Sequence, residues 1–427
     1  MGTTDQYTFR TFPAAVAADG SAAPDTAVWL DAERRGFHDN RLDPAGTAAA
    51  AARLVADGRQ LTGAYLAVDA AATPAPVATF ASYTATLNVG AAELLPTHLI
   101  SNVTVRPTHR RRGLLRTMMT ENLRRASEAG FPLAALTVSE ATIYRRFGFG
   151  VASTVAHVTV STDERFRMLV PPPGRSEYID LPELARLAPA VFARFHAHNP
   201  GSVDRHAATW PRNSGELTDS GQPDLSVYAA AHYDDSGEPD GYVSYRSREN
   251  SSPRTLEVLD LVAASDSAYL GLWDFLASID LAGRVDWEVA PADDPLRWAL
   301  ADWRAVTQTF VEDWLWLRVL DVPAAFEARG YLPGASGEIV LRVADALGYA
   351  AGTFRLRVAD ARATVTRVES DPDLTLDAPE LGSLYLGGVD PLTLLAAGRL
   401  TEHTPGAARR LRTLLAPTAP VYGTTHF

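Results

Sequence analysis

The chain has 427 residues, of which 46% are hydrophobic, and it carries a formal net charge of −12 at pH 7 and no cysteine. These values predict two or three domains with sizeable cores, and they exclude a disulfide framework and cysteine-based catalysis or metal binding. The negative charge disfavours nucleic acid as a partner, because duplex affinity depends on neutralising phosphates, and it favours a cationic small molecule. No apolar run reaches the roughly 18 residues of a membrane span, and the N-terminus lacks a secretory signal, so we expect a cytoplasmic protein without membrane contact.

The first 160 residues alternate between helical and strand-like patterns. Helical patterns cover 25–37, 43–56, 113–129 and 139–147, and strand patterns cover 61–68, 77–87, 99–105, 133–138 and 151–160. This order of hairpin, strand, helix, strand and helix predicts an α/β unit.

A stiff segment at 171–178 marks a boundary, and the same order then repeats. A hairpin around 234–241 is followed by a strand at 255–262, a helix at 268–279, a strand at 285–289 and a helix at 294–303. The turn of this second unit reads AASDSAYLGL and has no arginine, so we expect a structural copy without a cofactor site. From Trp314 onward, strands followed by helices predict an α+β module.

The segment NVTVRPTHRRRGLLRTMM, at 102–119, concentrates positive charge between a strand and a helix. Free backbone N–H groups at a helix N-terminus favour a phosphate, and Gly113 permits close approach of the backbone. The pattern is neither a Walker loop nor a G-x-G-x-x-G turn. The structural alternative is a solvated basic helix start.

Read as Arg110-x-x-Gly113-x-Leu115, this turn resembles the R/Q-x-x-G-x-G/A signature of GNAT N-acetyltransferases, with leucine in place of the last small residue. The segments ALTVSEATIYRRFGFG, VPAAFEARGY and LGSLYLGG and the terminal phenylalanine resemble the Eis (enhanced intracellular survival) family, over roughly 80–427. The resemblance implies an α+β fold with tandem GNAT domains and a sterol-carrier-protein-like C-terminal domain, assembled as a homohexamer. It places the domains at 1–162, 163–310 and 311–427.

The resemblance implies acetyl-CoA as cofactor. The backbone of a strand can pair with the pantetheine amides, and the arginine turn can bind the pyrophosphate. The cofactor-binding residues it implies are Val103, Thr104, Val105, Arg110, Arg111, Arg112, Gly113, Leu114, Leu115, Arg116, Ser139 and Glu140.

Two groups are implied as catalytic. Tyr144 is the general acid, since a phenol can donate a proton to a leaving thiolate, although a packed aromatic is the structural alternative. The C-terminal carboxylate of Phe427 is the general base. An α-carboxyl has an ordinary pKa of about 3.5, and burial raises the pKa of such a group, but a chain end is usually a solvated one.

Acceptor contacts are expected from Trp29, Phe37, His38, Tyr83 and His426. Relatives carry an acidic residue at the position of His426, so this departure affects the binding of polycations.

Two other segments, one rich in histidine and one rich in acidic residues, do not fit a metal site. The histidines of HAHNPGSVDRH, at 196–206, have no carboxylate context, and ESDPDLTLD, at 369–377, lacks an EF-hand glycine. The tryptophans Trp298, Trp303, Trp314 and Trp316 are expected in the core at the junction with the last domain.

The resulting hypothesis is an acetyl-CoA-dependent N-acetyltransferase that acts on amines of cationic small molecules of aminoglycoside type, with several positions as targets. An acetyltransferase for polyamines or protein lysines, and a non-catalytic acetyl-CoA-binding or sensing protein, are the alternatives. The sequence identifies neither the physiological acceptor nor the number of acetylations.

Overall fold

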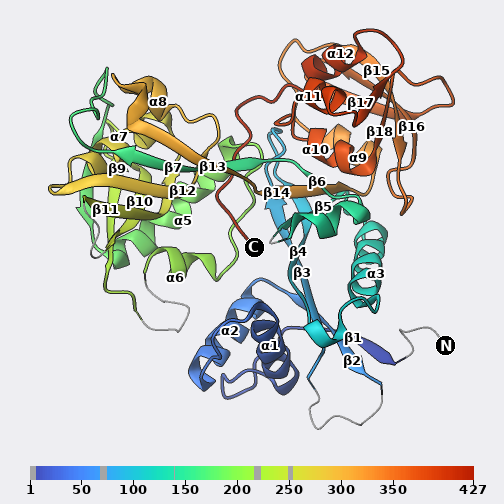
Figure 1. Cartoon of the computed structure of the whole chain (residues 1–427), viewed down its shortest axis with the longest axis horizontal. Helices are drawn as coiled ribbons and strands as arrows, with labels where there is room; N and C mark the ends of the chain where they lie inside the picture. The colour runs from blue at the N-terminus through green and yellow to red at the C-terminus, as the bar shows by residue number, and fades with distance from the viewer. Residues whose placement is uncertain (1–5, 68–74, 139, 216–222, 249–252) are drawn as a thin grey trace.

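The computed structural model describes residues 6–67, 75–138, 140–215, 223–248 and 253–427. Within these residues the chain forms three sheets, each with its own covering helices, as Figure 1 shows. We name the three bodies the first unit, the second unit and the C-terminal module. Together they confirm the predicted mixed fold.

The first unit is built on a seven-stranded sheet of described residues with the order β1-β2-β3-β4-β5-β14-β6. Its strands are β1 Tyr7–Pro13, β2 Gln60–Leu66, β3 Ala78–Leu87, β4 Leu95–Val105, β5 Leu133–Thr137, β14 Leu315–Val319 and β6 Gly150–Val151. Alternate residues of β3 serve opposite faces: Phe80 packs with α3 (Leu114–Glu128), whereas Ala81 packs with α1 (Pro24–Phe37) and α2 (Pro44–Ala56). Two apolar clusters thus sandwich the sheet.

The second unit has a seven-stranded sheet of described residues with the order β13-β7-β12-β11-β10-β9-β8. Its strands are β13 Val306–Asp313, β7 Thr154–Ser161, β12 Ala282–Pro291, β11 Arg254–Ala263, β10 Pro239–Arg248, β9 Val227–Tyr233 and β8 Arg175–Ile179. The helices are α5 Leu181–His198, α6 Thr209–Asn213, α7 Asp266–Ala277 and α8 Leu296–Ala299, with a 3₁₀ turn η3 at Trp303–Ala305. The expected hairpin, strand, helix and strand are present, and the last expected helix is reduced to the short α8 and η3.

The two large sheets exchange strands, which corrects the sequence analysis. The strand expected at 151–160 to complete the first unit is β7, and it lies between β13 and β12 in the second sheet. Conversely, the WLWLRVL strand expected in the last domain is β14, and it lies between β5 and β6 of the first sheet. All five residues of β14 are buried, and α10 of the C-terminal module (Ala378–Leu384) packs on this strand.

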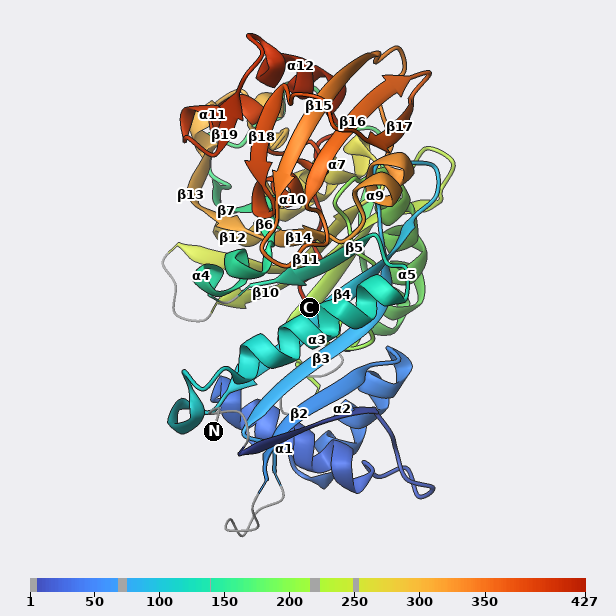
Figure 2. The ribbon, with the colours of Figure 1, turned by 90° about the vertical axis from the view of Figure 1, so that its right-hand side faces the viewer.

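The C-terminal module carries a five-stranded sheet of described residues with the order β17-β16-β15-β18-β19. Its strands are β15 Gly337–Ala344, β16 Gly352–Ala359, β17 Arg362–Arg367, β18 Leu374–Asp377 and β19 Leu400–Glu402, and its helices are α9 Val322–Ala328, α10 Ala378–Leu384, α11 Pro391–Ala396 and α12 Ala407–Leu414. Helix α10 packs on β14 and β6, so the module rests on the first sheet (Figure 2).

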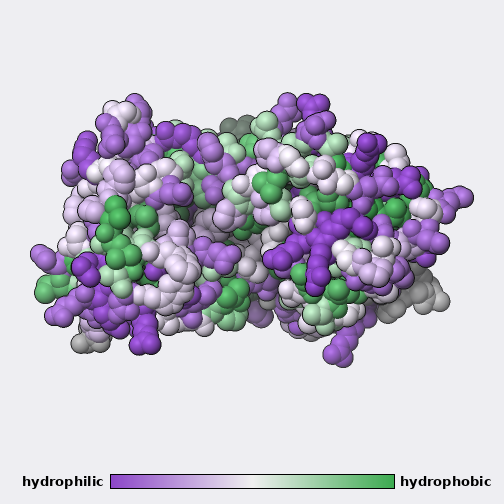
Figure 3. Space-filling model, turned by 90° about the horizontal axis from the view of Figure 1, so that it is seen from above, coloured by the Kyte–Doolittle hydropathy of each residue, from purple (hydrophilic) through white to green (hydrophobic). Residues whose placement is uncertain are grey.

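The predicted tryptophan core is only half correct. Trp314 and Trp316 are buried, but Trp298 is 75% exposed and stacks edge to face on the exposed Trp303 at 4.5 Å. The expected helix at 294–303 is correspondingly broken into α8 and η3. Figure 3 shows that the upper face of the molecule is mainly hydrophilic, with separate hydrophobic spots. Among the described residues, no helix has both the length and the apolar character that a membrane crossing needs.

Candidate functional site

The central feature of the first unit is a gap between two parallel strands. β4 and β5 pair only at His98 with Ala134 and at Leu99 with Ala135. Beyond this point β4 continues to Val105, and its strand partner among the described residues is β3 alone. One edge of β4 is therefore open to pair with an extended ligand.

Only alternate residues of β4 direct their backbone N–H and C=O groups toward the open edge. The Arg106 N–H donates to the carbonyl of Val77 at 2.9 Å, which extends the β3–β4 ladder. By the alternation of antiparallel pairing, Thr104 is bonded toward β3, whereas the N–H and C=O groups of Val103 and Val105 point to the open edge. Thr104 thus directs its backbone groups to β3, and its place in the predicted cofactor-binding set stays a prediction. Its hydroxyl also turns away, to within 2.7 Å of that of Thr79.

A β-bulge directs β4 away from β5. The pairing of β3 with β4 shifts register after Thr79, and Asn102 adopts a left-handed conformation with φ of 52°. The Asn102 side chain accepts a hydrogen bond from Arg59 at 2.7 Å and donates one to Glu33 at 2.9 Å. Burial raises the pKa of the Glu33 carboxyl. These buried bonds hold the bulge in place from α1 and from the start of β2.

After β4 the chain makes a tight turn into a helix. A 3₁₀ turn, η1, spans Pro107–His109, and Gly113 then occupies the N-cap position of α3 with φ of 82°, a conformation that favours glycine. No side chain caps α3. The N–H groups of its first turn, from Leu114 to Arg116, are therefore available to an anion.

The arginines of this turn differ in their contacts, and the Arg110 Nε–H donates to the carbonyl of Val105 at 3.5 Å. Arg112 donates to the hydroxyl of Tyr7 at 3.0 Å and to the carbonyl of Thr108 at 3.3 Å. Arg110, Arg111 and Arg116 are exposed around the uncapped helix end. The structure thus brings the predicted arginines together at one anion-attracting turn.

A short helix, α4 (Ala141–Tyr144), follows β5 and carries the predicted acid. Ser139 lies outside the described residues, and Glu140 is exposed at the N-cap of α4. The Tyr144 ring is 7% exposed and packs edge to face on Phe149 at 6.4 Å. Burial, and next the charge of Glu140, raise the pKa of Tyr144 to about 12. The side chain therefore remains a protonated phenol at neutral pH.

The end of the chain lies at the end of β5. The Thr137 hydroxyl donates to a terminal carboxylate oxygen of Phe427 at 2.6 Å, and the Phe427 N–H donates back to it at 3.2 Å. The Phe427 side chain is buried and packs edge to face on the ring of Tyr83 at 6.2 Å. Two of the predicted residues, Phe427 and Tyr83, thus meet beside the strand that leads to Tyr144.

The other residues predicted to contact the acceptor substrate differ in their exposure. Trp29 is fully buried in the core, and its indole N–H donates to the carbonyl of Thr62 at 2.9 Å, so its assignment as an acceptor contact is wrong. Phe37 and His38 are exposed at the end of α1. His426 is exposed and lies edge to face on Trp314 at 5.4 Å.

Two further groups at the site were not predicted. The Arg59 guanidinium lies 4.3 Å from the centre of the Tyr83 ring and is paired with Asp57 at 3.0 Å. His206 Nε2 donates to the carbonyl of His426 at 3.0 Å. Burial, and next the charge of Arg59, lower the pKa of His206 to about 4. His206 is therefore neutral at pH 7.

His206 should make the protein acid-sensitive. Its ordinary pKa of 6.5 applies to the unfolded chain, which then binds a proton between pH 6.5 and about 4 that the folded chain does not bind. Stability therefore falls as the pH decreases through this window, by about 2 kcal/mol between pH 7 and pH 5. Melting temperatures at the two pH values should differ less for His206→Gln than for the unaltered protein. The exposed His403→Gln is the control, and an unchanged difference in His206→Gln would contradict this role.

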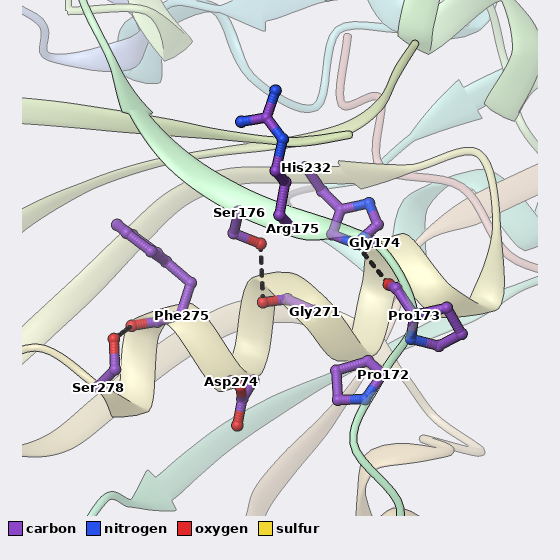
Figure 4. Close-up of a pocket in the computed structure, with 10 residues that line it drawn as sticks. All are labelled: Pro172, Pro173, Gly174, Arg175, Ser176, His232, Gly271, Asp274, Phe275 and Ser278. Atoms are coloured by element: carbon purple, nitrogen blue, oxygen red, sulfur yellow. Dashed lines mark hydrogen bonds between the residues drawn. The ribbon is translucent and has the colours of Figure 1, made fainter. Parts of the chain in front are cut away.

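A separate pocket of about 190 Å³ lies in the second unit, between 172–176 and α7 (Figure 4). His232 bonds through Nδ1 to Asp240 at 2.6 Å and donates through Nε2 to the carbonyl of Pro173 at 3.0 Å. Ser176 donates to the carbonyl of Gly271 at 3.0 Å. These bonds fasten the segment between the units to the second sheet, away from the open edge of β4. Among the described residues, no group of three or more metal-ligating side chains is assembled.

Comparisons with known proteins match each body. Acetyltransferase (GNAT) domain families match residues 24–152 and 201–319, and the sterol carrier protein domain family matches residues 322–423. The chain is 37% identical to N-acetyltransferase Eis of Mycobacterium tuberculosis, over 78% of this chain and 82% of that protein. It has the same identity to an uncharacterized N-acetyltransferase of Streptomyces avermitilis, over 78% and 81% of the two chains. The crystal structure of Eis1 from Mycobacterium abscessus superposes with a TM-score of 0.78 at 31% identity, over 98% of this chain and all of that one.

Proposed function

The chain belongs to the Eis family of GNAT N-acetyltransferases and uses acetyl-CoA, and from this premise we propose that it acetylates amines of cationic small molecules. Aminoglycosides are the acceptors to test first, with acetylation at several positions. The observation that carries the proposal is the pair of hydrogen bonds between Thr137 and Phe427, which fix the terminal carboxylate beside the open edge of β4.

The donor fits the groups that the first unit offers. The backbone groups of Val103 and Val105 at the open edge have the donor and acceptor pattern that the pantetheine amides need. A cofactor amide at the Val105 carbonyl would replace the 3.5 Å hydrogen bond that this carbonyl accepts from Arg110 Nε. The uncapped start of α3, with Arg110, Arg111 and Arg116 around it, suits the pyrophosphate. Leu114 and Leu115 would contribute through their N–H groups, since Leu114 is buried in the core. Acetyl-CoA supplies the acetyl group as a thioester.

The proton transfers then fall to two groups of this chain. The carboxylate of Phe427 accepts the proton that the acceptor amine loses, and the Tyr144 phenol donates a proton to the sulfur that leaves. Burial suits both roles. Burial keeps the Tyr144 hydroxyl protonated. The buried Phe427 ring and the hydrogen bond from Thr137 together hold the Phe427 carboxylate in one position.

The acceptor proposal rests on charge. The net charge of −12 attracts cationic amines. Next to the partners of Phe427, however, Arg59 lies over the Tyr83 ring and the neutral His206 bonds to His426. Thiol release from acetyl-CoA should be measured with kanamycin, a polyamine and a lysine peptide. Release with kanamycin supports the aminoglycoside proposal, and release only with one of the others moves the acceptor to that class. Acetyl-CoA binding without thiol release from any amine would favour the binding or sensing alternative.

Removing one arginine from the turn should weaken cofactor binding more than it slows turnover. Arg111→Ala removes an exposed cation from the uncapped end of α3. We expect about 10- to 100-fold weaker acetyl-CoA binding by calorimetry, equivalent to about 1.5–3 kcal/mol. Arg304→Ala removes the same charge from an exposed position of the second unit and should leave the affinity unchanged. Equal affinities for the two variants would mean that Arg111 does not contact the cofactor.

We also propose a homohexamer, following the family resemblance. Light scattering on the purified protein should then give about six times the chain mass of 45.9 kDa. A monomer or dimer over the working concentration range would contradict this assembly.

A further inference from the structure

The second unit repeats the strand divergence of the first. β11 and β12 pair in parallel only over a short stretch, from Arg254 opposite Ala282 to Glu257 opposite Asp286. Both strands continue beyond this stretch without pairing with each other. The helix that follows, α7, is capped by the Ser265 side chain, and the Ser265 hydroxyl donates to Asp240 at 2.5 Å. The second unit thus keeps the gap, but it places carboxylates where the first unit offers arginines to an anion.

The C-terminal tail, which we define as residues 420–427, descends beside the second unit and ends at the first unit (Figure 1). The Tyr422 hydroxyl donates to the carbonyl of Val289 at 2.5 Å, in the part of β12 that no longer pairs with β11. The Tyr422 ring is 8% exposed and packs edge to face on Phe195 of α5 at 5.9 Å. The tail is therefore hydrogen-bonded to the diverging part of β12 through Tyr422 and to the end of β5 through Phe427.

Residues 200–205 hold the tail between these two points. The Tyr422 N–H donates to the carbonyl of Pro200 at 2.8 Å, and the Thr425 hydroxyl donates to the carbonyl of Val203 at 2.7 Å. Arg205 donates to the Thr424 hydroxyl at 3.2 Å. The last six residues are thus fixed through both backbone and side chains.

Arg205 is itself rigidly placed. Its two terminal nitrogens each lie 2.7 Å from an oxygen of Asp260 on β11, and one of them lies 2.7 Å from the Tyr242 hydroxyl on β10. Its guanidinium is fully buried and lies 4.4 Å from the centre of the Phe192 ring. A bidentate, buried ion pair with an aromatic neighbour has one geometry, so the donor that it presents to Thr424 is fixed.

We propose that the second GNAT unit is the docking site of the C-terminal tail, with Tyr422, Thr424 and Thr425 as positioning residues that set where the Phe427 carboxylate lies. This inference rests on the proposed role of Phe427 as the base. Phe427 lies five residue steps after Tyr422, a distance of about 17 Å in extended form, so a shift at the second unit is carried directly to the carboxylate. The partner recognised by the gap of β11 and β12 is a segment of this same chain.

The test removes the docking bonds without altering the catalytic groups. The triple variant Tyr422→Phe/Thr424→Val/Thr425→Val keeps the shape of the tail and leaves the Arg205–Asp260 pair intact. The control Tyr331→Phe/Thr413→Val removes the same kinds of bonds from the C-terminal module, where Tyr331 donates to Phe326 and Thr413 to Arg409. We expect kcat of the triple variant to fall about 10- to 100-fold, with KM for acetyl-CoA within about twofold of the unaltered enzyme.

Two further measurements separate positioning from general destabilisation. Carboxypeptidase A should release Phe427 at least about tenfold faster from the triple variant than from the control, because a displaced end is accessible. Added sodium acetate should restore part of the lost kcat, relative to sodium chloride of equal ionic strength, because a free carboxylate can replace a displaced one. If the triple variant does not fold, Tyr422→Phe alone is compared with Tyr331→Phe in the same assays.

The outcomes distinguish the two levels of the proposal. Undiminished kcat and an unchanged rate of Phe427 release in the triple variant would overturn the docking role. If an enzyme extended beyond Phe427 also kept full turnover, the role of Phe427 as base would fail as well. If the extension abolished turnover while the triple variant was unaffected, only the docking inference would fail.

Discussion

Extending the chain by a few residues beyond Phe427 should lower kcat by about 10²-fold or more. The extension turns the terminal carboxylate into an amide, which cannot accept a proton. It also forces extra chain into the space where Phe427 packs against Tyr83 and bonds to Thr137. Acetyl-CoA affinity and Tm should hardly change, since the open edge of β4 and the arginine turn are not altered. Steady-state kinetics with a thiol-release assay provide the measurement.

Deletion of Phe427 gives an independent version of the same test. It moves the carboxylate back by about 3.3 Å, one strand residue, which is beyond hydrogen-bond tolerance. The control carries the same added residues in front of Met1, and it should keep full kcat. A C-terminally extended enzyme with undiminished turnover would exclude the carboxylate as the base. Glu140 or His426, acting through a water chain, would then be the better candidates.

Tyr144→Phe should lower kcat by about 10²-fold while leaving KM for acetyl-CoA nearly unchanged. The substitution removes the proton for the leaving sulfur but keeps the ring that packs on Phe149. Because the pKa of Tyr144 is raised to about 12, this residue should produce no alkaline loss of kcat in the unaltered enzyme up to about pH 10. Tyr385→Phe, which removes a buried hydroxyl bonded to the carbonyl of Ala325, is the control. Equal kcat values for the two variants would remove Tyr144 from the mechanism.

Local patterns explain what the sequence predicted well. A strand, a turn with Gly113 and an amphipathic helix are specified by neighbouring residues, so the arginine turn and α3 follow from their own segment. The same holds for the repeat that forms the second unit, where Ser265 caps α7. In each case the signal and the structure lie within a few residues of one another.

Long-range pairing explains what the sequence could not predict. Thr137 and Phe427 are 290 residues apart, and Arg59 meets Asn102 across 43 residues, so no local pattern marks either contact. Trp29 is not an acceptor contact, because the face of α1 that carries it packs on the sheet. The identity of an aromatic residue does not reveal which face of a helix is buried.

The strand exchange escaped prediction for the same reason. β7 follows the first unit directly in sequence, and β14 precedes the C-terminal module, so proximity in the chain favoured the wrong sheets. The predicted boundaries at 162/163 and 310/311 stay predictions, but neither separates complete sheets. What decides the placement of β14 is the edge of β5 that it covers, and that edge is visible only in three dimensions.

The position of β14 has a consequence for how the protein is made. β5 ends at Thr137, but the strand that covers its free edge ends at Val319, about 180 residues later. A ribosome adding about 5–20 residues per second needs about 10–35 s for that stretch. Throughout this interval the apolar strand β5 presents a row of unpaired backbone N–H and C=O groups at that edge, which is an aggregation hazard. The edge of β5 therefore stays without its native partner until the later strand emerges.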